Sequence, residues 1–74
     1  MKEITINVSY FPDDGTWLAE CDEIGLVTES RNYGALVSRA LEILPELAIE
    51  NGFTQKNEKL VASFVQKHSL LIVT

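Results

Sequence analysis

The chain has 74 residues, with 11 acidic and 6 basic side chains and a formal net charge of −5 at pH 7. A chain of this length makes one domain, which we place at residues 1–74, and it buries only about 60% of its unfolded surface. The negative charge argues against direct nucleic-acid binding, because that binding depends on Lys and Arg displacing counterions from phosphate. It favours a basic partner, which an acidic surface attracts and orients.

Cysteine content and hydropathy predict the compartment. Cys21 is the only cysteine, which excludes an internal disulfide and fits a reducing cytoplasm. Met1 to Ile4 lead directly into a strand pattern without the apolar region of a signal peptide. The longest apolar run, Leu70 to Val73, is too short to span a membrane. We therefore expect a cytoplasmic protein with no membrane segment.

The first third of the chain predicts an antiparallel β-hairpin. Residues 4 to 10 alternate between apolar and polar, which is typical of a strand with one buried face. The turn sequence Pro12 to Gly15 follows, and Thr16 to Asp22 return as a second strand. We expect Tyr10 and Trp17 to lie in the core. The side chains expected on the inner face are Ile4, Ile6, Val8, Tyr10, Trp17, Ala19 and Cys21.

A single amphipathic helix is predicted from Asn32 to Gly52, after a short third strand at Leu26 to Glu29. Its apolar residues recur at helical spacing on one side. Asn32 can cap the first turn, and Gly52 can end the helix because it tolerates a left-handed conformation. We expect a kink near Leu41 to Pro45. The apolar stripe consists of Tyr33, Leu36, Val37, Ala40, Leu44, Leu47 and Ala48.

The last part of the chain predicts strands at Leu60 to Gln66 and Ser69 to Val73, joined by either a bend or a turn. Together these elements predict an α+β fold of two layers. The expected sheet is antiparallel, has about four strands, and carries the helix on one face in the order β-β-β-α-β. Phe64 and Leu71 add apolar surface, so an edge position for the last strand would allow a homodimer by strand pairing.

Residues with catalytic potential do not form a recognisable set. Cys21 is surrounded by carboxylates, which disfavour a reactive thiolate and favour a structural residue. His68, the only histidine, is expected at an exposed bend. No phosphate-binding glycine motif is present. We therefore expect no enzyme activity, catalytic residue, cofactor or metal site.

Carboxylates are concentrated in the first thirty residues, at Asp13, Asp14, Glu20, Asp22, Glu23 and Glu29. Solvated turns and outward strand positions account for most of them. A surface for a basic partner is the main functional interpretation. A divalent-metal site of a minimal ribonuclease-H-like nuclease is a less favoured alternative, since the residues are spread over two loops and both strand faces.

Two motifs resemble the HicB-like antitoxin superfamily. The first is Gly15-Thr16-Trp17-Leu18-Ala19-Glu20-Cys21-Asp22, followed by Gly25-Leu26-Val27-Thr28-Glu29. The second is Leu44-Pro45-Glu46-Leu47 with Glu50-Asn51-Gly52, which is similar to a short, stand-alone subset of unassigned function. The resemblance covers about residues 3 to 73. The usual proline before Gly25 and the C-terminal DNA-binding segment of many members are both missing.

The resemblance implies a β-β-β-α-β, partial ribonuclease-H-like fold. It also implies a non-enzymatic module that binds a small basic, mRNA-cleaving toxin and covers its RNA surface. Operator repression is not implied, because the DNA-binding segment is absent. The partner contacts that we expect are Asp13, Asp14, Glu20, Asp22 and Glu23. The alternative function is a homo-oligomeric structural module joined through the C-terminal strand.

Overall fold

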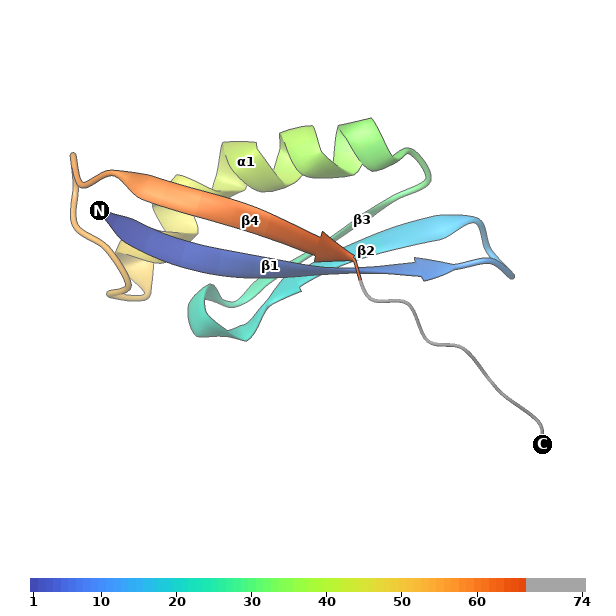
Figure 1. Ribbon diagram of the computed structural model, residues 1–74, viewed down its shortest axis with the longest axis horizontal. Helices are drawn as coiled ribbons and strands as arrows, with labels where there is room; N and C mark the ends of the chain where they lie inside the picture. Colours follow the sequence, from blue (N-terminus) through green and yellow to red (C-terminus); the bar gives the residue numbers. More distant parts are fainter. Residues whose placement is uncertain (67–74) are drawn as a thin grey trace.

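The computed structural model describes residues 1–66, which form one sheet and one long helix. The helix lies across one face of the sheet, and the other face is open (Figure 1). The predicted β-β-β-α-β order and two-layer α+β class are confirmed. The elements are β1 (Lys2–Phe11), β2 (Thr16–Cys21), the short 3₁₀-helix η1 (Asp22–Ile24), β3 (Leu26–Ser30), α1 (Tyr33–Glu50) and β4 (Leu60–Gln66).

The strand order in the sheet is β3-β2-β1-β4. β1 and β2 form the predicted antiparallel hairpin, with Tyr10 opposite Trp17, and β3 pairs antiparallel with β2, with Cys21 opposite Leu26. β4, however, runs parallel to β1. The prediction of a wholly antiparallel sheet is therefore wrong at β4. The reason is that α1 carries the chain back along the sheet, so the next strand enters in the same direction as β3.

Both helix ends are fixed by the residues that the sequence indicated. The side chain of Asn32 accepts a hydrogen bond from the Ala35 N–H at 2.9 Å, as an N-cap does. The helix itself ends at Glu50, and Gly52 follows with φ of 71°. The Gly52 N–H donates to Ile49 and the Phe53 N–H donates to Ala48, which is the hydrogen-bond pattern of a Schellman motif.

Pro45 lies inside α1, and the helix continues through it to Glu50. Pro45 itself is exposed, so its ring faces away from the sheet. Leu44 and Ala48, on either side of it in the sequence, both remain buried. The apolar stripe therefore stays in phase across the proline.

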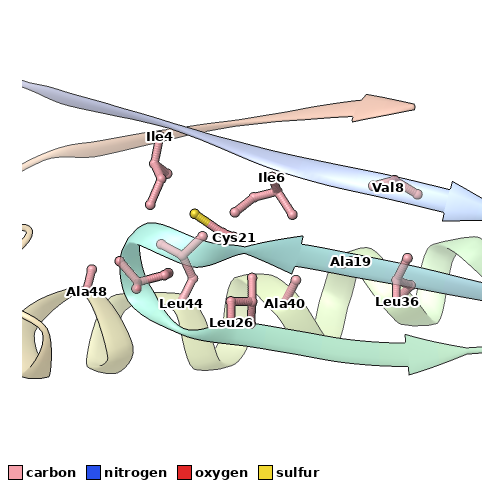
Figure 2. Packing of buried hydrophobic residues seen from close by; sticks show 11 residues of the cluster. Ile4, Ile6, Val8, Ala19, Cys21, Leu26, Leu36, Ala40, Leu44 and Ala48 are labelled. Atoms are coloured by element: carbon pink, nitrogen blue, oxygen red, sulfur yellow. The ribbon is translucent and has the colours of Figure 1, made fainter. Parts of the chain in front are cut away.

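The core lies between α1 and the inner face of the sheet. Leu36 and Ala40 of the helix, and Ile6 and Val8 of β1, have no exposed surface. Figure 2 shows side chains of α1 directed at those of β1, β2 and β3. The full set of buried apolar residues is Ile4, Ile6, Val8, Ala19, Cys21, Ile24, Leu26, Leu36, Ala40, Leu44 and Ala48. The predicted burial of the helix stripe against the sheet is confirmed for Leu36, Ala40, Leu44 and Ala48, which belong to the same buried cluster as the β1 residues. The predicted stripe residue Tyr33 is exposed, and α1 lies mainly over β3, β2 and η1.

Three sequence expectations fall on residues 67–74 and lie outside the described part of the chain. They are the strand at Ser69 to Val73, the bend at His68 and the apolar contribution of Leu71. Within residues 1–66, no helix is long and apolar enough to cross a membrane.

Candidate partner-binding site

The predicted contact residues divide between the two ends of β2. Asp13 and Asp14 are exposed in the β1–β2 turn, whereas Asp22 and Glu23 are exposed in η1. β2 has six residues, so these ends lie about 20 Å apart at roughly 3.3 Å per residue. Glu20 lies on the open face of the sheet, paired with Val27 of β3. The structure therefore forms two acidic ends rather than one continuous acidic patch.

The η1 end is tied to the carboxyl end of α1. The Asn51 side-chain amide donates to the carbonyl of Ile24 at 3.0 Å and to that of Leu47 at 2.9 Å. The helix has no basic residue in its last turn, and Glu50 immediately precedes Asn51. A helix carboxyl end carries partial negative charge. The backbone there therefore adds to the negative charge of the acidic side chains at this end of the molecule.

The turn end holds an open cleft of about 650 Å³. Asp13 and Asp14 line it from the β1–β2 turn, and Glu29 lines it from the end of β3. Phe11, a residue that is 47% exposed, adds a phenyl ring to the lining. The complete lining is Phe11, Asp13, Asp14, Thr16, Glu29 and Arg31. With three carboxylates and the guanidinium of Arg31, the lining has a net charge of −2. This excess of carboxylates, together with the phenyl ring, suits a cationic side chain, since carboxylates pair with it and the ring face attracts it.

Local hydrogen bonds and strand register build this cleft. The N–H groups of Asp14 and Gly15 both donate to the Phe11 carbonyl, at 3.2 and 2.9 Å, and Gly15 has φ of 65°. The turn therefore holds the two aspartates at the tip of the hairpin. Glu29 reaches the same region because it pairs with Leu18 of β2, on the open face.

An aromatic stack lies on the opposite, helix-covered side of the same end. The ring centroids of Tyr10 and Trp17 are 4.6 Å apart, and those of Trp17 and Tyr33 are 5.0 Å apart. The stack links the hairpin to the first residue of α1, which helps to fix the geometry of the cleft region. Trp17 packs against the core as expected. The prediction that Tyr10 is a core residue is wrong, because its side chain is 44% exposed beyond the end of the core.

The other candidates for chemistry that lie within residues 1–66 are Cys21 and the remaining carboxylates. Cys21 is a free, buried thiol on the inner face, in line with its structural interpretation. Among residues 1–66, no group of three or more His, Cys, Asp or Glu side chains is placed to hold a metal ion. The carboxylates of the two acidic ends thus do not converge as a two-metal nuclease site needs.

One carboxylate has a clearly shifted pKa, and it lies in the loop before β4. The Thr54 hydroxyl donates to Glu58 at 2.5 Å, and the Gln55 N–H donates to the same oxygen at 3.1 Å. These bonds favour the ionised form and lower the pKa of Glu58 below its ordinary value. They close a small turn, so the role of Glu58 is to shape the loop.

Sequence reasoning did not find Phe11 or Arg31 as parts of the cleft, and it did not place Glu29 among the partner contacts. Phe11 breaks the run of polar residues on the outer face of β1, which was the one available signal. Glu29 and Arg31 meet the turn only because β3 pairs with β2 in this register. That register could not be read from the sequence pattern alone.

A family model described as a domain of unknown function, DUF1902, matches residues 3–71. The chain belongs to the DUF1902 family. A comparison with curated proteins gave no match. Among solved structures, this DUF1902 domain is similar to hypothetical protein TTHA1013 from the extremely thermophilic bacterium Thermus thermophilus. The TM-score is 0.77 and the identity 24%, with 96% of this chain and 100% of that chain covered. That similarity shows a shared fold.

Proposed function

We propose that this DUF1902 domain is a non-enzymatic protein-binding module that holds a small basic partner against its acidic surface. The role would be analogous to that of a HicB-type antitoxin, in the cytoplasm, with a toxin-like nuclease as the partner. The net charge of −5 supports electrostatic attraction of a basic protein. The motifs around Trp17 and Pro45 support the HicB analogy, which is an analogy of sequence and fold.

The observation that carries the proposal is the cleft at the turn end. It combines Asp13, Asp14 and Glu29 with Arg31, so two negative charges remain in excess for an incoming cationic group, and Phe11 provides an apolar contact beside them. An arginine side chain suits this arrangement best, because its planar guanidinium pairs with carboxylates and stacks on aromatic rings. The remaining expected contacts extend the attraction along the open face towards η1. These are Glu20, Asp22 and Glu23, and they contribute mainly to the rate of encounter, since exposed charges act at long range and through weak individual pairs.

The proposal is tested by affinity capture from cells of the native host. The full chain is immobilised, and bound proteins are compared at low and moderate salt by mass spectrometry. We expect a small basic protein that is retained at low salt and released as salt screens the charges. Capture of no basic protein at either salt concentration contradicts the proposal.

Variants of equal charge separate the site from the overall charge. Asp13→Asn/Asp14→Asn neutralises the cleft, and Glu42→Gln/Glu46→Gln neutralises two exposed residues on the outer side of α1. Both doubles change the net charge by the same amount. We expect the first to lose the partner and the second to retain it. Equal loss in both would mean that the partner responds only to total charge, which removes the cleft from the proposal.

A further inference from the structure

The outer edge of β4 has the chemistry of an interaction surface. Within residues 1–66, β4 pairs on one side only, with β1, so its other side presents a row of backbone N–H and C=O groups. Natural edge strands are usually protected by charged residues or proline. β4 has the sequence Leu-Val-Ala-Ser-Phe-Val-Gln and contains neither. Its seven residues are long enough to form a regular ladder with another strand.

The side chains of β4 are also only partly covered. On the open face, Val61 and Val65 are 41% and 46% exposed. On the inner face, Leu60, Ala62 and Phe64 are half-buried, because α1 packs mainly over β3, β2 and η1. A strand added beside β4 would therefore bury apolar surface on both faces.

The distribution of charge favours a second copy of this chain as the partner of the β4 edge. Two copies of a −5 chain repel each other, so they associate most favourably where neither copy is acidic. The two acidic ends lie at the β1–β2 turn and at η1, and Glu29 lies on β3, which the sheet order separates from β4 by two strands. β4 itself is uncharged, and its charged neighbours are of both signs. Those neighbours are Lys2, Glu3, Glu58 and Lys59.

We propose that two copies of this chain join edge to edge by antiparallel pairing of β4, centred on Ser63. This register is self-complementary, as a two-fold interface requires. It places Val61 opposite Val65 of the second copy on the open face, and Ala62 opposite Phe64 of the second copy on the inner face. About six to eight backbone hydrogen bonds form. The product is a continuous sheet with both helices on one face and a β3 strand at each outer edge.

The oligomeric state of the full chain is the first test. Sedimentation velocity at tens of micromolar is expected to give a dimer that dissociates on dilution. Hydrogen exchange is expected to protect β4 amides at high concentration and to release them on dilution. A wild-type chain that stays monomeric overturns the proposal. This holds also if the reason is that residues 67–74 of the same chain cover the β4 edge.

A matched pair of variants locates the interface. Val61→Lys and Val27→Lys each place a lysine at an exposed valine of an edge strand, beside Glu3 and Glu20 respectively. Both change the net charge equally. Val61→Lys is expected to raise the dimer dissociation constant by about tenfold and at most about thirtyfold, since it disturbs two symmetry-related cross-strand pairs of up to about 1 kcal/mol each. Val27→Lys is expected to leave the dimer dissociation constant unchanged. An equal change in that constant for the two variants overturns the proposal.

The double variant Val61→Lys/Val65→Glu tests the register. In one chain these residues are four positions apart on a strand, about 13 Å, too far for a direct pair. In the proposed dimer each lysine faces a glutamate of the second copy, so the double is expected to recover most of the affinity lost in Val61→Lys. Circular dichroism confirms that each variant is folded. A folded double that remains as weak as the single variant overturns this register.

Discussion

The packing of α1 on the sheet predicts a large difference between two identical substitutions in one helix. Leu36 has no exposed surface, and Leu41 is 51% exposed on the outer side of α1. Leu→Ala at either site changes helix propensity by the same small amount. The difference between the two variants therefore isolates the contribution of burial.

The expected cost of Leu36→Ala is about 3 kcal/mol of unfolding free energy, from lost apolar burial and the cavity left behind. Leu41→Ala is expected to cost less than about 0.7 kcal/mol. A domain of 74 residues has a total stability of roughly 4 to 11 kcal/mol at ~0.05–0.15 kcal/mol per residue. Leu36→Ala thus removes a quarter or more of the stability.

Urea unfolding followed by circular dichroism measures both variants. With a slope of about 1 kcal/mol per M, the midpoint of Leu36→Ala is expected to fall by about 3 M. Protein concentration is kept constant, because self-association would add to the apparent stability. Equal urea midpoints for the two variants would refute the claim that Leu36 faces the sheet while Leu41 faces solvent.

Three further predictions concern the helix ends and the loop before β4. Asn32→Ala should cost about 1 kcal/mol by removing the cap of the Ala35 N–H, measured by thermal unfolding against Asn57→Gly as a loop control. Gly52→Ala should cost about 1 kcal/mol, since its φ of 71° strains an L-residue although the space around it is open; an unchanged midpoint would contradict the Schellman geometry. Glu58→Gln should lower stability near neutral pH, because the folded-state pKa of Glu58 is lowered and its charged form stabilises the fold. That contribution is present above the ordinary Glu pKa and is lost as pH falls through the lowered value, so the unfolding free energies of the two proteins should become equal in acid. A difference in unfolding free energy that grows in acid would contradict the lowered pKa.

Local signals predicted most of the fold. The alternation of Ile4, Ile6 and Val8 identified the inner face of β1, and all three are buried. Asn32 and Gly52 marked the two ends of the helix, because capping depends on the side chain and on backbone freedom at single positions. These features are encoded by neighbouring residues and could be read without knowledge of the rest of the molecule.

Features that depend on distant segments could not be predicted in the same way. The parallel direction of β4 follows from the return path of α1, and the strand pattern is the same in either direction. Tyr10 continues the apolar alternation but lies past the end of the core, which is set by where the helix begins. The cleft needs Glu29 and Asp13 on the same lining, and that placement depends on the register of two strand pairs.

The central claim is that a basic partner docks on the acidic turn end, and the salt dependence of association tests it most directly. The association rate of the captured partner is measured with wild type, Asp13→Asn/Asp14→Asn and Glu42→Gln/Glu46→Gln at increasing ionic strength. We predict that the wild-type rate falls steeply with salt, that the cleft variant starts slower and falls less steeply, and that the helix variant follows the wild type. A rate that is independent of salt, or a cleft variant that matches the wild type throughout, would contradict the claim.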